Sequence, residues 1–139
     1  MLEMPKSNID PRERSSLALA FLGDSVLALL VRARLLAGSR LPPGALHREA
    51  AQVVSAKGQS SVLDTLLPLL TEEEAGVLRR GRNASKSSVS KHATPQQYQA
   101  STGLEAVFGW LYLQNRHERI QELFEHIWRC HLHQTEPPE

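Results

Sequence analysis

The chain has 139 residues, of which 41% are apolar and 22% charged, and its formal net charge is only +1. This mixture is typical of a single globular domain and excludes a disordered chain. The first ten residues lack the basic flank and apolar core of a signal peptide, no apolar run is expected to reach the ~18–20 residues of a membrane span, and Cys130 is the single cysteine. We therefore expect a cytoplasmic protein that does not enter a membrane.

The first half of the chain predicts an arm followed by three helices. Residues 1–14 are polar and aperiodic, which is typical of a flexible N-terminal arm. Ser15 or Ser16 can cap a helix that ends at Gly38, before Pro42 and Pro43. Two further helices are expected over about residues 45–54 and 56–70.

The second half predicts three more helices. Thr71 with Glu74 forms a capping box that opens a helix to about residue 82, and residues 83–93 read as a loop. Thr94, Pro95 and Gln97 open a long helix to about residue 114. A last helix covers about residues 118–131, and residues 134–139 are expected to be a disordered tail. No strand pattern is present, so the fold is expected to be all-α, with one domain over residues 15–133.

Two carboxylates occupy positions that favour apolar residues. Asp24 follows the apolar stripe of the first helix, and Glu105 interrupts the otherwise apolar segment 103–113, so both are expected to face the core. Two isolated carboxylates on buried helices suit a shared hard cation such as Mg²⁺; alternatively, each pairs with an arginine or caps a helix. Gly103 and Gly109 weaken their helix and predict close approach of another helix or a ligand.

Positive charge gathers between Glu74 and Glu105, a segment that contains no acidic residue. A segment whose charges are all positive either binds a polyanion or is a solvated basic loop. Its cations are Arg79, Arg80, Arg82, Lys86 and Lys91. A second cluster, His126, Cys130, His131 and His133, lacks the paired spacing of zinc sites.

The ordered motifs of the chain resemble the ribonuclease III family. Residues 17–27, which read LALAFLGDSVL, are similar to its signature helix, and residues 101–109, STGLEAVFG, to its later Phe-Glu-Ala helix. Between them, LHREA at 46–50, VSAK at 54–57 and RGRNA at 80–84 resemble the Mini-ribonuclease III branch, which lacks a double-stranded RNA-binding domain. Order and spacing agree over about residues 16–130.

The resemblance implies a helical endonuclease-domain bundle with an Mg²⁺-dependent endoribonuclease activity; Mn²⁺ is expected to substitute. Its expected substrate is double-stranded RNA, cut to 5′-phosphate and 3′-hydroxyl ends during maturation of large-subunit (23S) ribosomal RNA. Asp24 and Glu105 would be the catalytic residues and the metal ligands. Full-length family members carry further acidic residues where this chain has Leu17, Ala20 and Thr102. Only two acidic metal ligands are therefore expected here. Thr102 is a candidate to orient water, or its hydroxyl bonds a backbone carbonyl.

The same resemblance suggests which residues bind RNA and which form the subunit interface. Candidate RNA-binding residues are Arg79, Arg80, Arg82, Asn83, Lys86, Lys91 and Lys57. Gln97, Tyr98 and Ser101 are weaker candidates, and core packing is the preferred alternative for Tyr98. Cutting both strands calls for a homodimer, with an interface expected at Phe21, Leu27, Leu30 and Val31. The alternative function is a non-catalytic helical module that binds RNA or the ribosome; a protein-interaction domain is a third.

Overall fold

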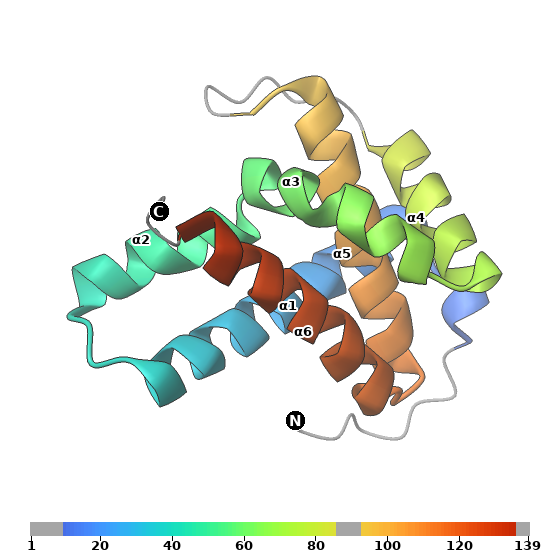
Figure 1. Cartoon of the computed structure of the whole chain (residues 1–139). Coiled ribbons are helices and arrows are strands. Elements are labelled where there is room, and N and C mark those ends of the chain that lie inside the picture. The colour runs from blue at the N-terminus through green and yellow to red at the C-terminus, as the bar shows by residue number, and fades with distance from the viewer. Residues whose placement is uncertain (1–9, 86–92, 136–139) are drawn as a thin grey trace.

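The computed structural model describes residues 10–85 and 93–135, which form α-helices and two short 3-10 helices without a β-strand (Figure 1). The helices are α1 (Ser16–Gly38), α2 (Pro43–Val54), α3 (Ala56–Leu66), α4 (Glu72–Ala84), α5 (Pro95–Leu113) and α6 (His117–Thr135), and the 3-10 helices are η1 (Pro11–Glu13) and η2 (Leu67–Leu69). The predicted all-α fold is confirmed.

Local capping signals set where the helices begin. The Ser15 side chain caps α1 by accepting a hydrogen bond from a first-turn backbone N–H. Thr71 with Glu74 and Thr94 with Gln97 form the two predicted capping boxes, in which side chain and backbone bond reciprocally. These bonds satisfy backbone donors that the first turn of a helix leaves unpaired.

Several boundaries differ from the sequence expectation. Asp10 caps the turn Pro11–Glu13, so this part of the expected flexible arm is structured. α3 ends at Leu66, because Pro68 lacks the N–H that a continuing helix needs, and a 3-10 turn follows. α6 extends to Thr135, beyond the predicted end. Residues 1–9 and 136–139 lie outside the described residues.

Helix α5 is the centre of the fold. It packs on α1, α4, α3 and α6 (Figure 1). Its apolar residues are buried on every side, and Leu104, Phe108 and Leu111 have no exposed surface. The prediction that this helix is buried all round is confirmed.

Helix α1 has one apolar face in the core and a second one outside. Leu27, Leu30 and Val31 belong to the core of the chain itself, so their prediction as dimer-interface residues was wrong. Phe21 is 83% exposed and remains available for a dimer interface, and Leu36 is 67% exposed. By length and composition alone α1 could cross a membrane, contrary to the sequence expectation. Its buried face packs on α5 and α2, as in the core helix of a globular domain.

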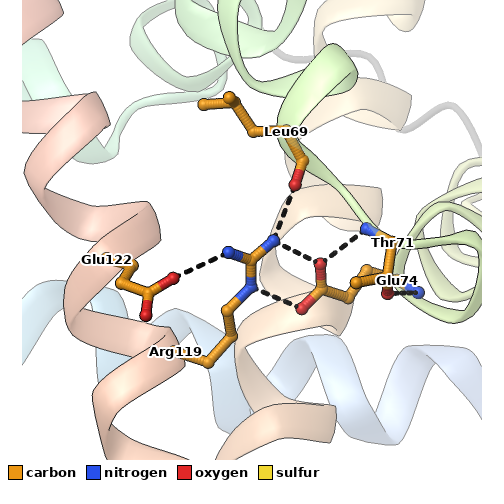
Figure 2. A network of polar contacts seen from close by, with 5 residues as sticks. All are labelled: Leu69, Thr71, Glu74, Arg119 and Glu122. Carbon is orange, nitrogen blue, oxygen red and sulfur yellow. Dashed lines mark hydrogen bonds and ion pairs between the residues drawn. The ribbon is translucent and has the colours of Figure 1, made fainter.

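A buried ion pair ties α4 to α6 (Figure 2). Arg119 of α6 donates from Nε and Nη2 to the fully buried Glu74 carboxylate at 2.9 and 2.8 Å, and from Nη2 to the Leu69 carbonyl at 2.7 Å. Burial raises the pKa of Glu74, but the hydrogen bonds from Arg119 and the Thr71 N–H outweigh it and hold that pKa below its ordinary value. The network fixes the start of α4, the helix that carries Arg79, Arg80 and Arg82.

Candidate active site

Glycines bring the backbones of α1 and α5 into contact. A Cβ atom at Gly23 would lie 1.6 Å from the Glu105 carbonyl oxygen, and one at Gly109 would lie 2.0 Å from the Leu19 carbonyl oxygen. No other residue fits at either position without moving the helices apart. The predicted close approach at Gly109 is confirmed, and Asp24, the residue after Gly23, is thereby placed beside Glu105.

The two carboxyl groups meet, and their contact changes the ionisation of Glu105. Burial, and then a hydrogen bond and repulsion from Asp24, raise the pKa of Glu105 to about 8, while a hydrogen bond from Gln59 acts in the opposite direction. Two carboxylates in contact repel when both are charged, so one proton is shared by the pair at neutral pH unless a cation replaces it.

Nothing else in the described part of the chain neutralises this pair. No arginine or lysine among residues 10–85 and 93–135 forms an ion pair with either carboxylate. The alternative of separate arginine partners is therefore not what the structure contains. Within the same residues no group of three or more His, Cys, Asp or Glu side chains could hold a metal ion, including the histidines of α6. The candidate site is a pair of acids.

The environments of the two acids differ. Glu105 is partly buried, whereas Asp24 is exposed, although it was expected to face the core. The buried stripe of α1 passes through Ala20, Gly23 and Leu27, and Asp24 lies just past its edge. One carboxylate is thus open to solvent and to a substrate, and the other is held in the protein.

Gln59 is a member of the site that the sequence analysis missed. Its side chain comes from α3 and is 2% exposed, and its interaction with Glu105 lowers the pKa of that carboxyl group. The available signal was a glutamine on an apolar stripe, because Val62, Leu63 and Leu66 follow it at helical spacing and are buried.

Thr102 follows the second of its two predicted alternatives. Its hydroxyl donates to the Tyr98 carbonyl at 2.9 Å and contacts the Ser85 hydroxyl at 3.2 Å. Ser101 is 5% exposed and also donates to the Tyr98 carbonyl. Gln97 is engaged in the capping box of α5. These contacts give local structural roles to Thr102, Ser101 and Gln97.

The predicted basic residues lie on more than one surface. Arg82 packs its stem on α5, since a Cβ atom at Gly103 would lie 2.8 Å from Arg82 Cγ. Asn83 follows it and is exposed. Arg79 and Arg80 are also exposed but line a hollow of about 560 Å³ whose rim includes acidic residues. Lys86 and Lys91 lie outside the described residues.

A groove of about 700 Å³ runs between α2, α3 and the start of α5. Lys57 and Arg48 line it, together with the partly buried Tyr98. Arg48 was not among the predicted RNA-binding residues, although its charge and its position near Lys57 match theirs. The groove gives α2 and α3 a basic surface separate from that of α4.

Known proteins are similar to this chain in sequence and in fold. A family model described as Ribonuclease III domain matches residues 17–116, which include Asp24 and Glu105. Mini-ribonuclease 3 of Brevibacillus brevis is 45% identical over 84% of this chain and 87% of its own length. Mini-ribonuclease 3 of Synechocystis sp. is 46% identical over 78% of this chain and 74% of its own length. A crystal structure of a protein from Fusobacterium nucleatum superposes with a TM-score of 0.78 at 28% identity, covering 86% of this chain and 95% of that one.

Proposed function

The chain belongs to the ribonuclease III family and is an endoribonuclease for double-stranded RNA, and from that premise we propose that it is a cytoplasmic, Mg²⁺-dependent homodimer. We further propose that it matures large-subunit ribosomal RNA. The observation that carries the metal assignment is the contact between Asp24 and Glu105.

The donor set of this pair fits Mg²⁺. That ion prefers oxygen ligands, often one or two carboxylates, and keeps several waters for a substrate phosphate. Burial and mutual repulsion raise the pKa of Glu105, and a divalent cation between the two groups would relieve that repulsion. Asp24 and Glu105 would hold it, since no basic side chain in the described residues competes for them.

The bound ion would lower the pKa of a water molecule and neutralise the charge that builds on the scissile phosphate. Asp24, which is exposed, lies where a phosphodiester can reach it. Glu105 is partly buried and comes from the central helix, so its position is fixed by packing on several sides. The hydroxyl of Thr102 is committed to the Tyr98 carbonyl and is not proposed to orient water.

Duplex RNA is recognised mainly through its backbone, so exposed cations near the acids are the proposed contacts. Arg82 is the first candidate, because it is exposed on α4, a helix that packs on the one that carries Glu105. Lys57 and Arg48 offer a second contact in the groove on α2 and α3. Arg79, Arg80, Asn83, Lys86 and Lys91 remain predictions.

The proposed dimer uses the outer face of α1. Leu17, Phe21 and Leu36 are exposed on that helix, and Phe21 lies one turn before Asp24. A two-fold axis through this face would bring two active sites together, which supports cutting of both strands. Apolar side chains of this size exposed along one helix favour such an interface.

The test is substitution of each acid by its amide. Asp24→Asn and Glu105→Gln keep shape but remove the charge that holds a cation. We expect each variant to bind a long RNA duplex as the parent does, while cleavage with Mg²⁺ falls by at least about 100-fold. Denaturing gels and a mobility-shift assay measure the two properties. Full activity of either variant would remove that residue from the site. Binding without cleavage by the unaltered protein would favour the non-catalytic alternative.

A further inference from the structure

One side of α4 packs on α5 and continues to Ser85, the residue that follows the helix. A Cβ atom at Gly103 of α5 would lie 2.7 Å from the Leu78 carbonyl oxygen, and one at Gly81 would lie 2.9 Å from the Gly103 Cα atom. Leu78, Gly81 and Ser85 follow one another at the spacing of a single helix face. The two backbones are therefore in contact as far as Gly81, and Ser85 lies about one turn beyond that contact.

A hydrogen bond between two side chains joins Ser85 to α5. Oγ1 of Thr102 lies 3.2 Å from Oγ of Ser85 and 2.9 Å from the Tyr98 carbonyl oxygen. A hydroxyl group has one hydrogen to donate, and the Tyr98 carbonyl can only accept, so Ser85 donates the bond to Thr102. Both side chains are half-buried, where water competes less for such a bond. The end of α4 is thus tied to α5 after the contact between the backbones has stopped.

This tie lies next to the candidate active site. Thr102 precedes Glu105 by three residues on α5, so the two side chains are neighbours on the helix surface, with Cβ atoms about 5–6 Å apart. The bond to Thr102 therefore holds the end of α4 within about one helical turn of Glu105. Arg82 and Asn83, both exposed, belong to the last turn of α4.

We propose that Ser85 and Thr102 are positioning residues, whose hydrogen bond holds the last turn of α4, with the exposed Arg82, beside Glu105 for contact with the RNA backbone. The inference rests on the proposed function, in which Arg82 binds RNA. The ends of helices fray when no side chain holds them. A cation that is already held in place loses less conformational entropy when it meets a phosphate, and so it binds more tightly.

The experiment removes each hydroxyl group in turn. Ser85→Ala and Thr102→Val break the bond, and Thr102→Ser keeps it. Ser39→Ala is the matched control, because Ser39 follows α1 as Ser85 follows α4, and its hydroxyl donates to the carbonyl of Leu35, four residues earlier, at 3.0 Å. RNA affinity is measured by mobility shift in EDTA, and cleavage with Mg²⁺ gives KM and kcat. The free-ion electron paramagnetic resonance signal gives Mn²⁺ affinity without RNA, and thermal unfolding gives stability.

We expect Ser85→Ala and Thr102→Val each to weaken RNA binding and raise KM by about 2- to 10-fold, the effect of losing one hydrogen bond. The values of kcat and of Mn²⁺ affinity should equal those of the parent, because Gly23 and Gly109 make the contact between the two helices that carry the acids. Thr102→Ser should bind RNA as the parent does. The control should match the parent in every assay.

A second comparison asks whether the bond acts through Arg82. In a chain that already carries Arg82→Ala, the change Ser85→Ala should not weaken RNA binding further, because no cation is left to position. A bond that serves only the fold would lower the unfolding midpoint, and its loss would change RNA affinity equally with and without Arg82.

The outcomes separate the two proposals. Unchanged RNA affinity in Ser85→Ala, or an equal loss with and without Arg82, overturns the role of the bond and leaves the proposed function intact if the parent cleaves RNA with Mg²⁺. A loss of Mn²⁺ affinity in Ser85→Ala places the effect at the metal site and also overturns the inference. A parent that neither binds Mn²⁺ nor cleaves RNA overturns the proposed function itself. If Thr102→Val fails to fold, Ser85→Ala decides alone.

Discussion

Glu105 links the ionisation of the site to the stability of the fold. In the unfolded chain its carboxyl group has an ordinary pKa near 4.5, whereas in the folded protein burial and Asp24 raise that pKa to about 8. The folded state therefore binds the proton more tightly. Its stabilising effect is complete below pH 4.5 and is lost as the pH rises through about 8.

From this linkage we predict how Glu105→Gln behaves without metal. The parent in EDTA should lose thermal stability between about pH 6 and pH 8.5, and the variant, which has no charge to bury, should lose less. Adding Mg²⁺ or Mn²⁺ at the higher pH should restore the parent alone, because the cation replaces the missing proton. Scanning calorimetry at the two pH values measures this. Parallel pH profiles for parent and variant would contradict the assignment.

The same residues show what a sequence can reveal about a site. A charge in an apolar segment conflicts with its surroundings, and so Glu105 and Asp24 could be found without coordinates. Gln59 interrupts an apolar stripe as well, but it has no charge, so its conflict with its surroundings is weaker and it was missed. The exposure of Asp24 could not be read from periodicity, because it lies at the edge of the buried stripe and its side is decided by how α5 packs.

At the scale of the element, the contact between α1 and α5 depends on two glycines, and we predict that Gly109→Ala disrupts it. The new methyl group would lie 2.0 Å from the Leu19 carbonyl oxygen, which is backbone and cannot rotate away. Forcing the helices apart should lower the free energy of unfolding by about 1–3 kcal/mol or more. Metal binding should weaken as well, since Asp24 and Glu105 come from the two helices that separate.

The matched control for that prediction is Gly38→Ala. Gly38 is the last residue of α1, and a Cβ atom there would meet nothing within 4 Å. Because alanine favours a helix over glycine by up to about 1 kcal/mol, this variant should be unchanged or slightly more stable. Urea denaturation of both variants gives the comparison. Equal stability of Gly109→Ala and the parent would contradict the prediction, because it would mean that α1 and α5 accommodate a methyl group without separating.

Element boundaries were predictable where their causes are local. The capping boxes at Thr71 and Thr94 are sequence signals that act within one turn, and the structure contains both. Which helix packs against which depends on contacts distant in sequence. The close approach at Gly109 was predicted, but its partner helix was not. Gly23 went unnoticed as the matching contact on α1, although it forms the tighter of the two.

At the scale of the whole molecule, α1 serves the core with one face and presents Phe21 on the other. Leu27, Leu30 and Val31 were predicted at the interface because apolar periodicity alone cannot tell a core face from a subunit face. The structure assigns those three to the core and leaves Phe21 and Leu36 outside. The proposed dimer must therefore use the exposed side of this helix, next to Asp24.

We predict that Phe21→Ala separates the subunits and changes how RNA is cut. Burying a phenylalanine contributes about 1.5–3 kcal/mol, and a two-fold interface loses it twice, so the dissociation constant should rise by about 100-fold or more. The fold should survive, because this ring is not part of the core. Sedimentation velocity measures the assembly, with Leu132→Ala, an exposed leucine on α6, as the control. Isolated subunits should nick one strand of a duplex, visible as cleavage on denaturing gels without separation on native gels. Double-strand cleavage by a proven monomer would show that one chain supplies both cuts.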